Sequence, residues 1–327
     1  MIDLIDKKIL YYLEKDSRMP ISKLSKLVGA SRELILYRIS KLEEKNIIKS
    51  YIARINQSIF CTSGANLVVK LGYIEKKRYN EISNYLKSYG NINWFSDLCG
   101  SFDFSISILY RDSQELANII NDINLFLSSD LLSHNLCVYI SEYKFDRKGI
   151  LELKEKNHIN TRFEVNFNQI KKNELDEKEI IILKELAKNS KIKNTELAKK
   201  IKMGEDIVRI RIKKLEKKNV ILGYTIVINP YPLGFEGYSL YLQIEDMTEQ
   251  MQVKIKNYLY SNPYIYFCSR VAGKFNLIIG LYTKDRTHFK ENLSDIKNFF
   301  GKSLKDYEFQ LLMEEHKEIF IPDNLFN

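Results

Sequence analysis

The most constraining feature of this sequence is an internal duplication with a spacing of 173 residues. Residues 3–56 align with 176–229 without a gap, and 19 of the 54 aligned pairs are identical. The best-matched run is 38–46 against 211–219, and the same offset persists into the later part of each unit. A spacing of 20–50 residues would indicate a solenoid, whereas this much longer spacing indicates duplication of a whole protein. We therefore expect two tandem units in the 327-residue chain.

Positive charge is concentrated at the start of each unit. The chain has 51 basic and 42 acidic residues, for a net charge of +9. Segments 1–56 and 174–229 each carry +5 and the connector 147–173 carries +4, whereas 57–146 and 230–327 carry −3 and −2. A local basic face attracts a polyanion even when the total charge is modest. The partition predicts two basic heads, each followed by a mildly acidic domain.

Each head segment has the spacing of a helix-turn-helix. In the first head, apolar residues recur at helical spacing in three stretches, which predicts three helices. The first follows Asp3, the second has Leu24 and Leu27 on one face, and the third follows Ser31, a residue well suited to cap a helix. Gly29 lies in the short turn before the third helix. In this motif the last helix enters the major groove, so double-stranded DNA is the predicted partner. The residues expected to contact DNA are Ser31, Arg32, Glu33, Tyr37, Arg38 and Lys41 in the first head and Arg209, Arg211, Lys213 and Lys214 in the second.

The helical pattern by itself leaves other uses open. A three-helix head with a basic face also fits a protein-docking module or a dimerisation arm. The second head departs from the first, because Gly204 stands where the first has Ser31, and Glu205 and Asp206 open its third helix. Acidic residues at the start of a helix interact favourably with the helix dipole, but they also repel the phosphates of DNA. We expect the second head to bind DNA more weakly or to read different bases.

The segments after the heads alternate apolar and polar residues as strands do. Residues 67–71 and 102–108 show this alternation, and helical patterns lie between the strands. The order β-α-β-β-α-β is ferredoxin-like, with both helices on one face of an antiparallel sheet. The other face needs a cover, and the sheet of the other unit is the expected one. The predicted fold class is α+β, with two tandem units that each join a helix-turn-helix head to a ferredoxin-like domain.

These patterns resemble the Lrp/AsnC (feast/famine) transcription regulators. The resemblance rests on Asp3-x-x-Asp6-x-x-Ile9-Leu10, Arg38-Ile39-x-x-Leu42-Glu43, Ile48-x-x-Tyr51 and the turn Gly100-x-x-Asp103, and it covers both units apart from the connector. It implies that the heads bind DNA specifically to regulate transcription. It also implies that the domains at 57–146 and 230–327 are RAM-type domains, which pair sheet to sheet and bind an amino acid or similar effector near that turn.

The resemblance places the effector at two turns. The implied residues are Gly100, Ser101 and Asp103 in unit 1 and Gly273 and Asn276 in unit 2. Asn276 replaces Asp103, which removes a carboxylate that could pair with an amine, so unit 1 is the better candidate. A plain β-hairpin also requires glycine at such a turn.

Two heads on one chain change the assembly that is needed. The 27-residue connector spans up to about 90 Å when extended, enough to return the chain to the second head. We expect an intramolecular pseudo-dimer that reads a non-palindromic operator, and further homo-oligomerisation stays open.

Two other functions of this architecture compete with the regulator. Some fused pairs resemble sirohaem decarboxylases, which would need a histidine and arginines around a tetrapyrrole, and the four histidines here do not cluster in sequence. An architectural DNA-binding protein with little sequence preference is the other. No P-loop, dinucleotide fingerprint or nucleophile triad is present, so we expect no enzyme, cofactor or metal.

The remaining composition indicates a soluble protein in a reducing compartment. The four cysteines are far apart and include no C-x-x-C pair, which argues against a disulfide framework or zinc cluster. Cys99 and Cys268 are expected to be small buried residues, and Trp94 a core or sheet-interface aromatic. No 18-residue apolar run or signal peptide is visible. A cytoplasmic protein with no membrane partner is therefore expected.

Overall fold

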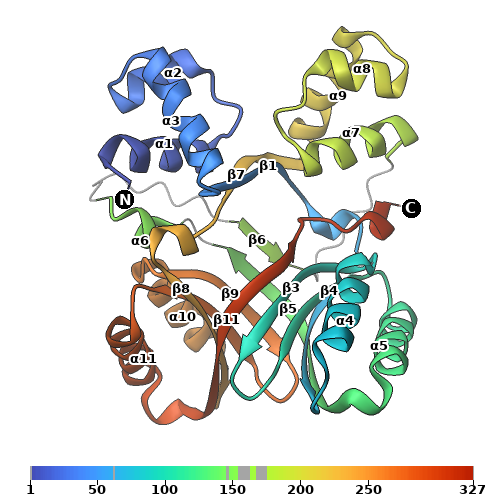
Figure 1. Cartoon of the computed structure of the whole chain (residues 1–327), viewed down its shortest axis with the longest axis vertical. Coiled ribbons are helices and arrows are strands. Elements are labelled where there is room, and N and C mark those ends of the chain that lie inside the picture. The colour runs from blue at the N-terminus through green and yellow to red at the C-terminus, as the bar shows by residue number, and fades with distance from the viewer. Residues whose placement is uncertain (1, 62, 145–146, 154–162, 167–174, 327) are drawn as a thin grey trace.

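The chain folds into two helical heads above a β-rich base (Figure 1). The computed structural model describes residues 2–61, 63–144, 147–153, 163–166 and 175–326. The predicted α+β class and the two tandem units are confirmed. None of the helices described is both long and apolar enough to cross a bilayer.

The first head is built from α1 (Leu4–Lys15), α2 (Ile21–Val28) and α3 (Arg32–Glu44). Asp3 and Asp6 form a reciprocal capping box at the start of α1. Gly29 ends α2 in the left-handed conformation (φ 80°), and Ser31 caps α3 by accepting a hydrogen bond from the Leu34 amide at 3.2 Å. The expected burial of Leu27 is wrong: its side chain is 39% exposed, because α2 turns Leu24 and Val28 to the core instead.

The second head repeats this arrangement with α7 (Glu177–Lys188), α8 (Asn194–Ile201) and α9 (Glu205–Lys217). Asp176 and Glu179 form the matching capping box. Lys202 adopts the left-handed conformation that Gly29 has in the first head, and Gly204 begins α9 without a side-chain cap. The backbone is thus conserved between the heads although the residues best suited to it are present in only one of them.

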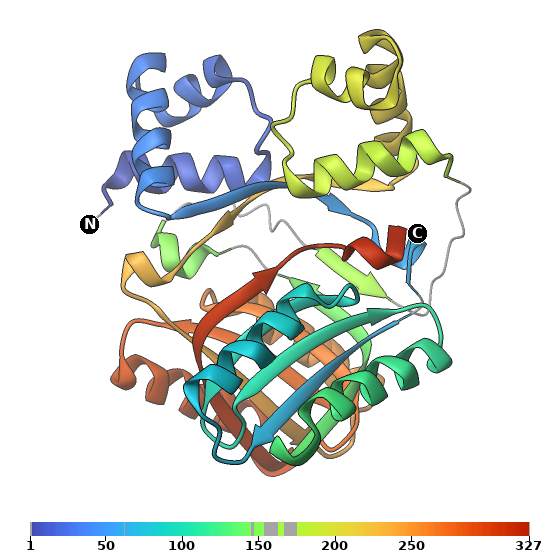
Figure 2. The same cartoon turned by 45° about the vertical axis from the view of Figure 1, so that its right-hand side comes forward.

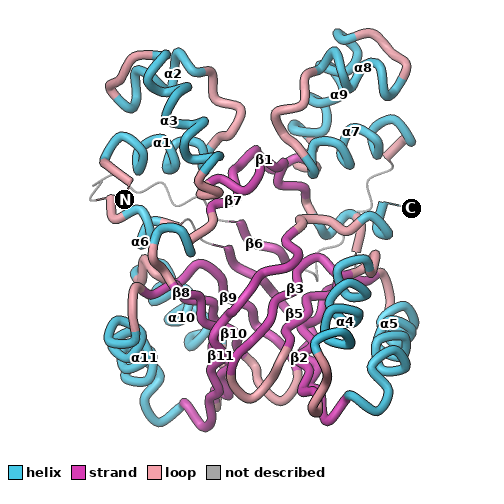
Figure 3. Tube along the Cα trace, in the orientation of Figure 1, coloured by secondary structure: helices cyan, strands magenta, loops and turns pink. Residues whose placement is uncertain are grey.

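A two-stranded ribbon lies between the heads and the base (Figure 3). It pairs β1 (Ile48–Ile55) antiparallel with β7 (Ile221–Ile228). Each head rests on the strand of the other unit: Ile226 and Ile228 join the core of the first head, and Ala53 and Ile55 join that of the second. The two heads are therefore crossed onto one shared support.

The base contains the predicted β-α-β-β-α-β order twice. Unit 1 provides β2 (Ser63–Leu71), α4 (Lys76–Ser88), β3 (Ile92–Cys99), β4 (Phe104–Tyr110), α5 (Ser113–Leu127) and β5 (Leu131–Lys144). Unit 2 provides β8 (Glu236–Ile244), α10 (Glu249–Ser261), β9 (Ile265–Ala272), β10 (Leu277–Thr283), α11 (Arg286–Phe300) and β11 (Leu304–Glu318). In the connector, α6 (Lys148–Leu151) and β6 (Phe163–Asn166) are described, and β6 pairs with β5.

The two sheets of the base are joined at their edges as well as facing one another. β11 pairs with β8 of its own unit and with β3 of unit 1, while β5 pairs with β2 and with β9. The order β2-β4-β3-β11-β8-β10-β9-β5 therefore closes back on β2. The sequence predicted facing sheets but not this closure, which gives hydrogen-bond partners to edges that would otherwise be open. The helices α4, α5, α10 and α11 cover the outside (Figure 2).

Three single-residue expectations, for Cys268, Cys99 and Trp94, have different outcomes. Cys268 is fully buried, but the expected burial of Cys99 is wrong, because Cys99 ends β3 at an exposed turn. Trp94 is half-buried on β3 and donates an indole N–H to Glu315 of β11, so it is a sheet-interface aromatic as predicted.

Candidate nucleic-acid interface

The outer faces of α3 and α9 form the candidate nucleic-acid interface, since both heads rise on the side of the ribbon opposite the base (Figure 2). Arg32, Glu33 and Tyr37 are exposed on α3, and Arg209 and Lys213 are exposed on α9. Large apolar side chains are also exposed there: Leu36 (55%), Tyr37 (58%) and Ile210 (64%). Leu36 and Ile210 were not among the predicted contact residues, although apolar side chains on a recognition helix are suited to thymine methyl groups.

Two of the predicted DNA-contacting arginines are engaged within their own heads. Arg38 pairs with Asp3 at 2.9 Å and with Asp6 at 3.4 Å, so the third helix is fixed to the start of the first. The Asp6 amide and the Arg38 guanidinium together lower the pKa of Asp3. Arg211 makes the matching pairs in the second head. In each head, the two acidic residues of the D-x-x-D/E motif and the arginine of the third helix thus hold the first and third helices together.

The other predicted cations divide into paired and unpaired groups. Lys41 pairs with Glu44 and Lys214 with Glu179, while Arg209 pairs with Asp206. Arg32 and Lys213 make no ion pair with any other residue that the structure describes. These two are therefore the cations most available to a phosphate or a base.

The heads meet on a pseudo-twofold axis. The hydroxyls of Ser17 and Ser190, which are equivalent residues of the two units, lie 2.9 Å apart in a buried contact. The Ser17 amide donates to Tyr224 O at 3.1 Å, and the Ser190 amide donates to Tyr51 O at 2.7 Å. Arg18 stacks over Tyr224 in the same region. These contacts fix the spacing of the two recognition helices within one molecule.

The two predicted effector turns lie against the last strand of the opposite unit. A Cβ on Gly100 would overlap the Gln310 side chain, and a Cβ on Gly273 would lie 2.7 Å from Leu136 O, beside Cys137. Cys137 and Gln310 are equivalent positions of the two units. Gly273 is needed because the backbone of the opposite strand comes so close, whereas Gly100 is needed because its φ of 151° disfavours any other residue.

The polar residues of these turns hold the hairpin to its neighbouring strand. Asp103 Oδ2 accepts from the Leu71 amide at 2.7 Å, and Asn276 Oδ1 accepts from the Ile244 amide at 2.8 Å. The side-chain oxygen of Asn276 thus accepts the same backbone hydrogen bond in unit 2 that Asp103 accepts in unit 1. Ser101 is exposed at the tip of its turn. An effector role for these residues stays a prediction.

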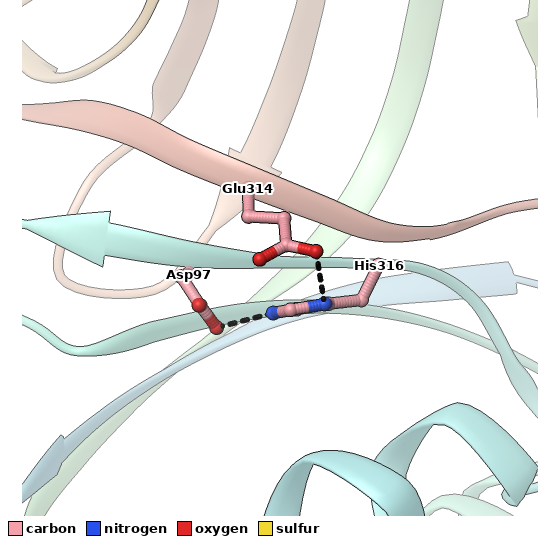
Figure 4. Close-up of side chains that lie close together, drawn as sticks. All are labelled: Asp97, Glu314 and His316. Atoms are coloured by element: carbon pink, nitrogen blue, oxygen red, sulfur yellow. Dashed lines mark ion pairs between the residues drawn. The ribbon is translucent and has the colours of Figure 1, made fainter. Parts of the chain in front are cut away.

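A buried histidine joins the two units beneath α4. His316 of β11 lies with Nε2 2.7 Å from Asp97 Oδ1 of β3 and Nδ1 3.4 Å from Glu314 Oε1 (Figure 4). Its ring stacks on Phe95, and Tyr79 donates its hydroxyl to Asp97. The two carboxylates approach opposite ring nitrogens, which orients the imidazole between them.

Comparison with known proteins matches this arrangement. A winged helix-turn-helix DNA-binding family matches residues 2–49 and again 175–221. The HTH-type transcriptional regulator LrpA of Pyrococcus abyssi is 48% identical over 123 residues, which are 37% of this chain and 85% of that protein. The regulator FL11 of Pyrococcus furiosus is 30% identical over 122 residues, again 37% of this chain, and 79% of that protein. The chain belongs to the Lrp/AsnC family. Each of these relatives matches less than half of this chain but most of its own length, as expected if this chain contains two units.

The fold of the entire Lrp/AsnC-type chain also has a counterpart among solved structures. The siroheme decarboxylase NirDL superposes with a TM-score of 0.63 over 98% of this chain and 96% of that chain, at 16% identity. At this identity the likeness shows a shared architecture only.

Proposed function

We propose that this Lrp/AsnC-family protein binds double-stranded DNA through both heads and regulates transcription as a single-chain counterpart of a regulator dimer. The observation that carries the proposal is the pairing of the heads on one pseudo-twofold axis at Ser17 and Ser190. A fixed spacing of two recognition helices suits half-sites one helical turn apart.

The two heads are expected to read different sequences. On α3 the exposed face presents Arg32, Glu33 and Tyr37, whereas on α9 it presents Asp206, Arg209 and Lys213. Because base readout depends on the donors and acceptors that enter the groove, two unlike faces prefer unlike half-sites. The preferred operator is therefore non-palindromic, and we further propose that a small effector modulates its binding.

Selection from random DNA with the purified full chain tests this proposal. We expect a non-palindromic consensus and binding that weakens steeply between 50 and 200 mM salt, because several phosphate contacts release counterions. Enrichment of perfect inverted repeats would contradict two unlike heads. Failure to shift any oligonucleotide at low salt would contradict DNA binding itself, and equal affinity for all sequences would instead indicate an architectural protein.

A tetrapyrrole enzyme is the second candidate, because the NirDL likeness spans both units. The described histidines occupy separate settings: His134 is exposed on β5, His288 lies on α11 against Tyr264, and His316 is enclosed by Asp97 and Glu314. His158 lies outside the described residues. We propose that the protein is not an enzyme. A Soret band acquired by the purified protein on mixing with sirohaem would revive the enzymatic alternative.

A further inference from the structure

A cavity of about 180 Å³ lies between the β1–β7 ribbon and the inner faces of the two sheets. A buried apolar cavity of roughly 150 Å³ is enough to hold benzene, so this space suits a ligand of about that size or slightly larger. It is separate from the glycine turns, whose residues do not line it.

The two units line this cavity with different chemistry. Unit 1 contributes Asn66, Ser105 and Ser107, whereas the equivalent positions of unit 2 are Ser239, Ile278 and Gly280. Asn66 Nδ2 donates to Ser105 Oγ at 2.9 Å, and the Tyr241 hydroxyl of unit 2 donates to Asn66 Oδ1 at 3.3 Å. A symmetric homodimer would present the same residues from both units, so the difference of Ser105 from Ile278 and of Ser107 from Gly280 depends on the duplication.

One acceptor in the wall has no protein partner. Asn93 of β3 is 7% exposed and lines the cavity, and its Oδ1 has no hydrogen-bond donor among the described residues. A buried acceptor left unpaired costs about 1–3 kcal/mol. A donor on a bound molecule would satisfy it.

Among the described residues that line the cavity, carboxylates outnumber guanidinium groups. These charged residues are Glu14, Glu142, Glu315 and Glu318 with Arg54 and Arg147. Glu315 accepts from the Trp94 indole at 3.3 Å and lies 3.5 Å from Lys49 Nζ, while Arg147 lies 3.6 Å from Glu318. Burial, and then the charge of Glu318, raise the pKa of Glu315. A cation on a bound molecule, in addition to Lys49 and Arg147, would further offset the repulsion between these two carboxylates.

We propose that this cavity binds a small molecule with a protonated amine, which Glu315 and Glu318 hold while Asn93 accepts a further hydrogen bond and Trp94 and Phe267 flank it. The amine is the shared chemistry of α-amino acids and of simple diamines. In a free amino acid the α-carboxylate would lie toward Arg147.

The position of the cavity connects it to the heads. Thr225 of β7 donates its hydroxyl to Glu14 O of α1 at 2.7 Å, and Arg54 of β1 donates to the same carbonyl at 3.0 Å. The Arg147 amide donates to the Glu14 carboxylate. All four of these residues line the cavity. A ligand there contacts the ribbon that carries both heads, which makes this cavity the site for the effector in the proposed function. The ligand is expected to bind in the cavity whether or not DNA is bound.

Titration of the purified full chain tests the binding step. Trp94 is the only tryptophan, so its emission reports on this site directly. The probes are the standard L-α-amino acids, linear diamines, and carboxylic acids that lack an amine, with calorimetry alongside fluorescence. We expect saturable binding of at least one amine and none of the amine-free acids. The arm that binds distinguishes an amino acid from a diamine.

Glu315→Gln is expected to weaken that binding at least tenfold, since it removes the charge but keeps the acceptor for Trp94. Glu308→Gln, on the same strand but paired with Lys274 outside the cavity, is the matched control. Ser105→Ile, which copies Ile278 of unit 2, is the second variant, to be used if Glu315→Gln does not fold, and we expect it to abolish binding.

Three results would overturn the proposal. The first is that no amine changes the Trp94 emission or the calorimetric signal, and the second is that Glu315→Gln binds the amine as tightly as the wild type. The third is that only Asp103→Asn abolishes amine binding, which would place the amine at the glycine turn. DNA shifts are measured separately on the same preparations. DNA binding without amine binding contradicts the cavity ligand alone, and amine binding without DNA binding contradicts the proposed function alone.

Discussion

The two units of this protein share a backbone but differ where a ligand would contact them. Their capping boxes, their helix-fixing arginines Arg38 and Arg211, and their turn acceptors Asp103 and Asn276 occupy equivalent positions with equivalent partners. Their recognition helices and inner sheet faces instead carry unlike residues. In a homodimer every substitution appears twice, so a duplicated chain is free to specialise one copy.

Reversing one charge on either head should have the largest effect. We expect Arg32→Glu and Lys213→Glu each to weaken binding to a selected operator roughly tenfold or more, because each replaces an exposed cation of a recognition helix that makes no ion pair with the described residues. Fluorescence anisotropy measures this, with Lys254→Glu on exposed α10 as a control of equal charge change. Weaker DNA binding by Arg32→Glu but not by Lys213→Glu would mean that the second head does not contact DNA.

The caps of the two recognition helices should differ in stability. Ser31→Ala removes the oxygen that accepts from Leu34 and should cost about 1 kcal/mol of unfolding free energy. Gly204→Ser, which introduces the missing cap on α9, should gain only a few tenths of a kcal/mol. Urea denaturation checks both, and an equal loss in Ser31→Ala and in Ser40→Ala would show that the cap contributes nothing specific.

A subtler effect is expected in the pH dependence of stability. The pKa of Glu315 is raised in the folded chain, so the native state binds this proton more tightly than the unfolded state. Its stabilising contribution is therefore present below the ordinary glutamate pKa of 4.5 and is lost as the pH rises through the raised value. The groups facing it are Glu318, Lys49, Arg147 and Trp94. Thermal melts without ligand should show that Glu315→Gln removes this loss of stability with rising pH, whereas Glu308→Gln retains it.

The smallest effect is expected at the turns. Asp103→Asn makes unit 1 like unit 2 and retains an acceptor for the Leu71 amide, losing only a pair with Lys70, which is about one-third exposed. We expect a change within about 0.5 kcal/mol by thermal melting. A larger loss would mean that the two turns are not equivalent in structure.

Much of the fold follows from local patterns in the sequence. The helices of both heads, the order of strands and helices in the base, and the caps at Asp3 and Ser31 depend on periodicity and on contacts only a few residues apart. The candidate DNA surface was predictable in outline for the same reason. The engagement of Arg38 and Arg211 was not, because their acidic partners lie more than 30 residues away in sequence.

The sequence by itself determined the duplication, the class of each domain and the division of charge, because all three are read along the chain. Only the tertiary structure decided that β5 and β11 each bridge the two units, that the heads meet at Ser17 and Ser190, and that unlike walls enclose one cavity. These features bring together residues from both units, and their pairing depends on strand edges and packed faces that no local pattern encodes.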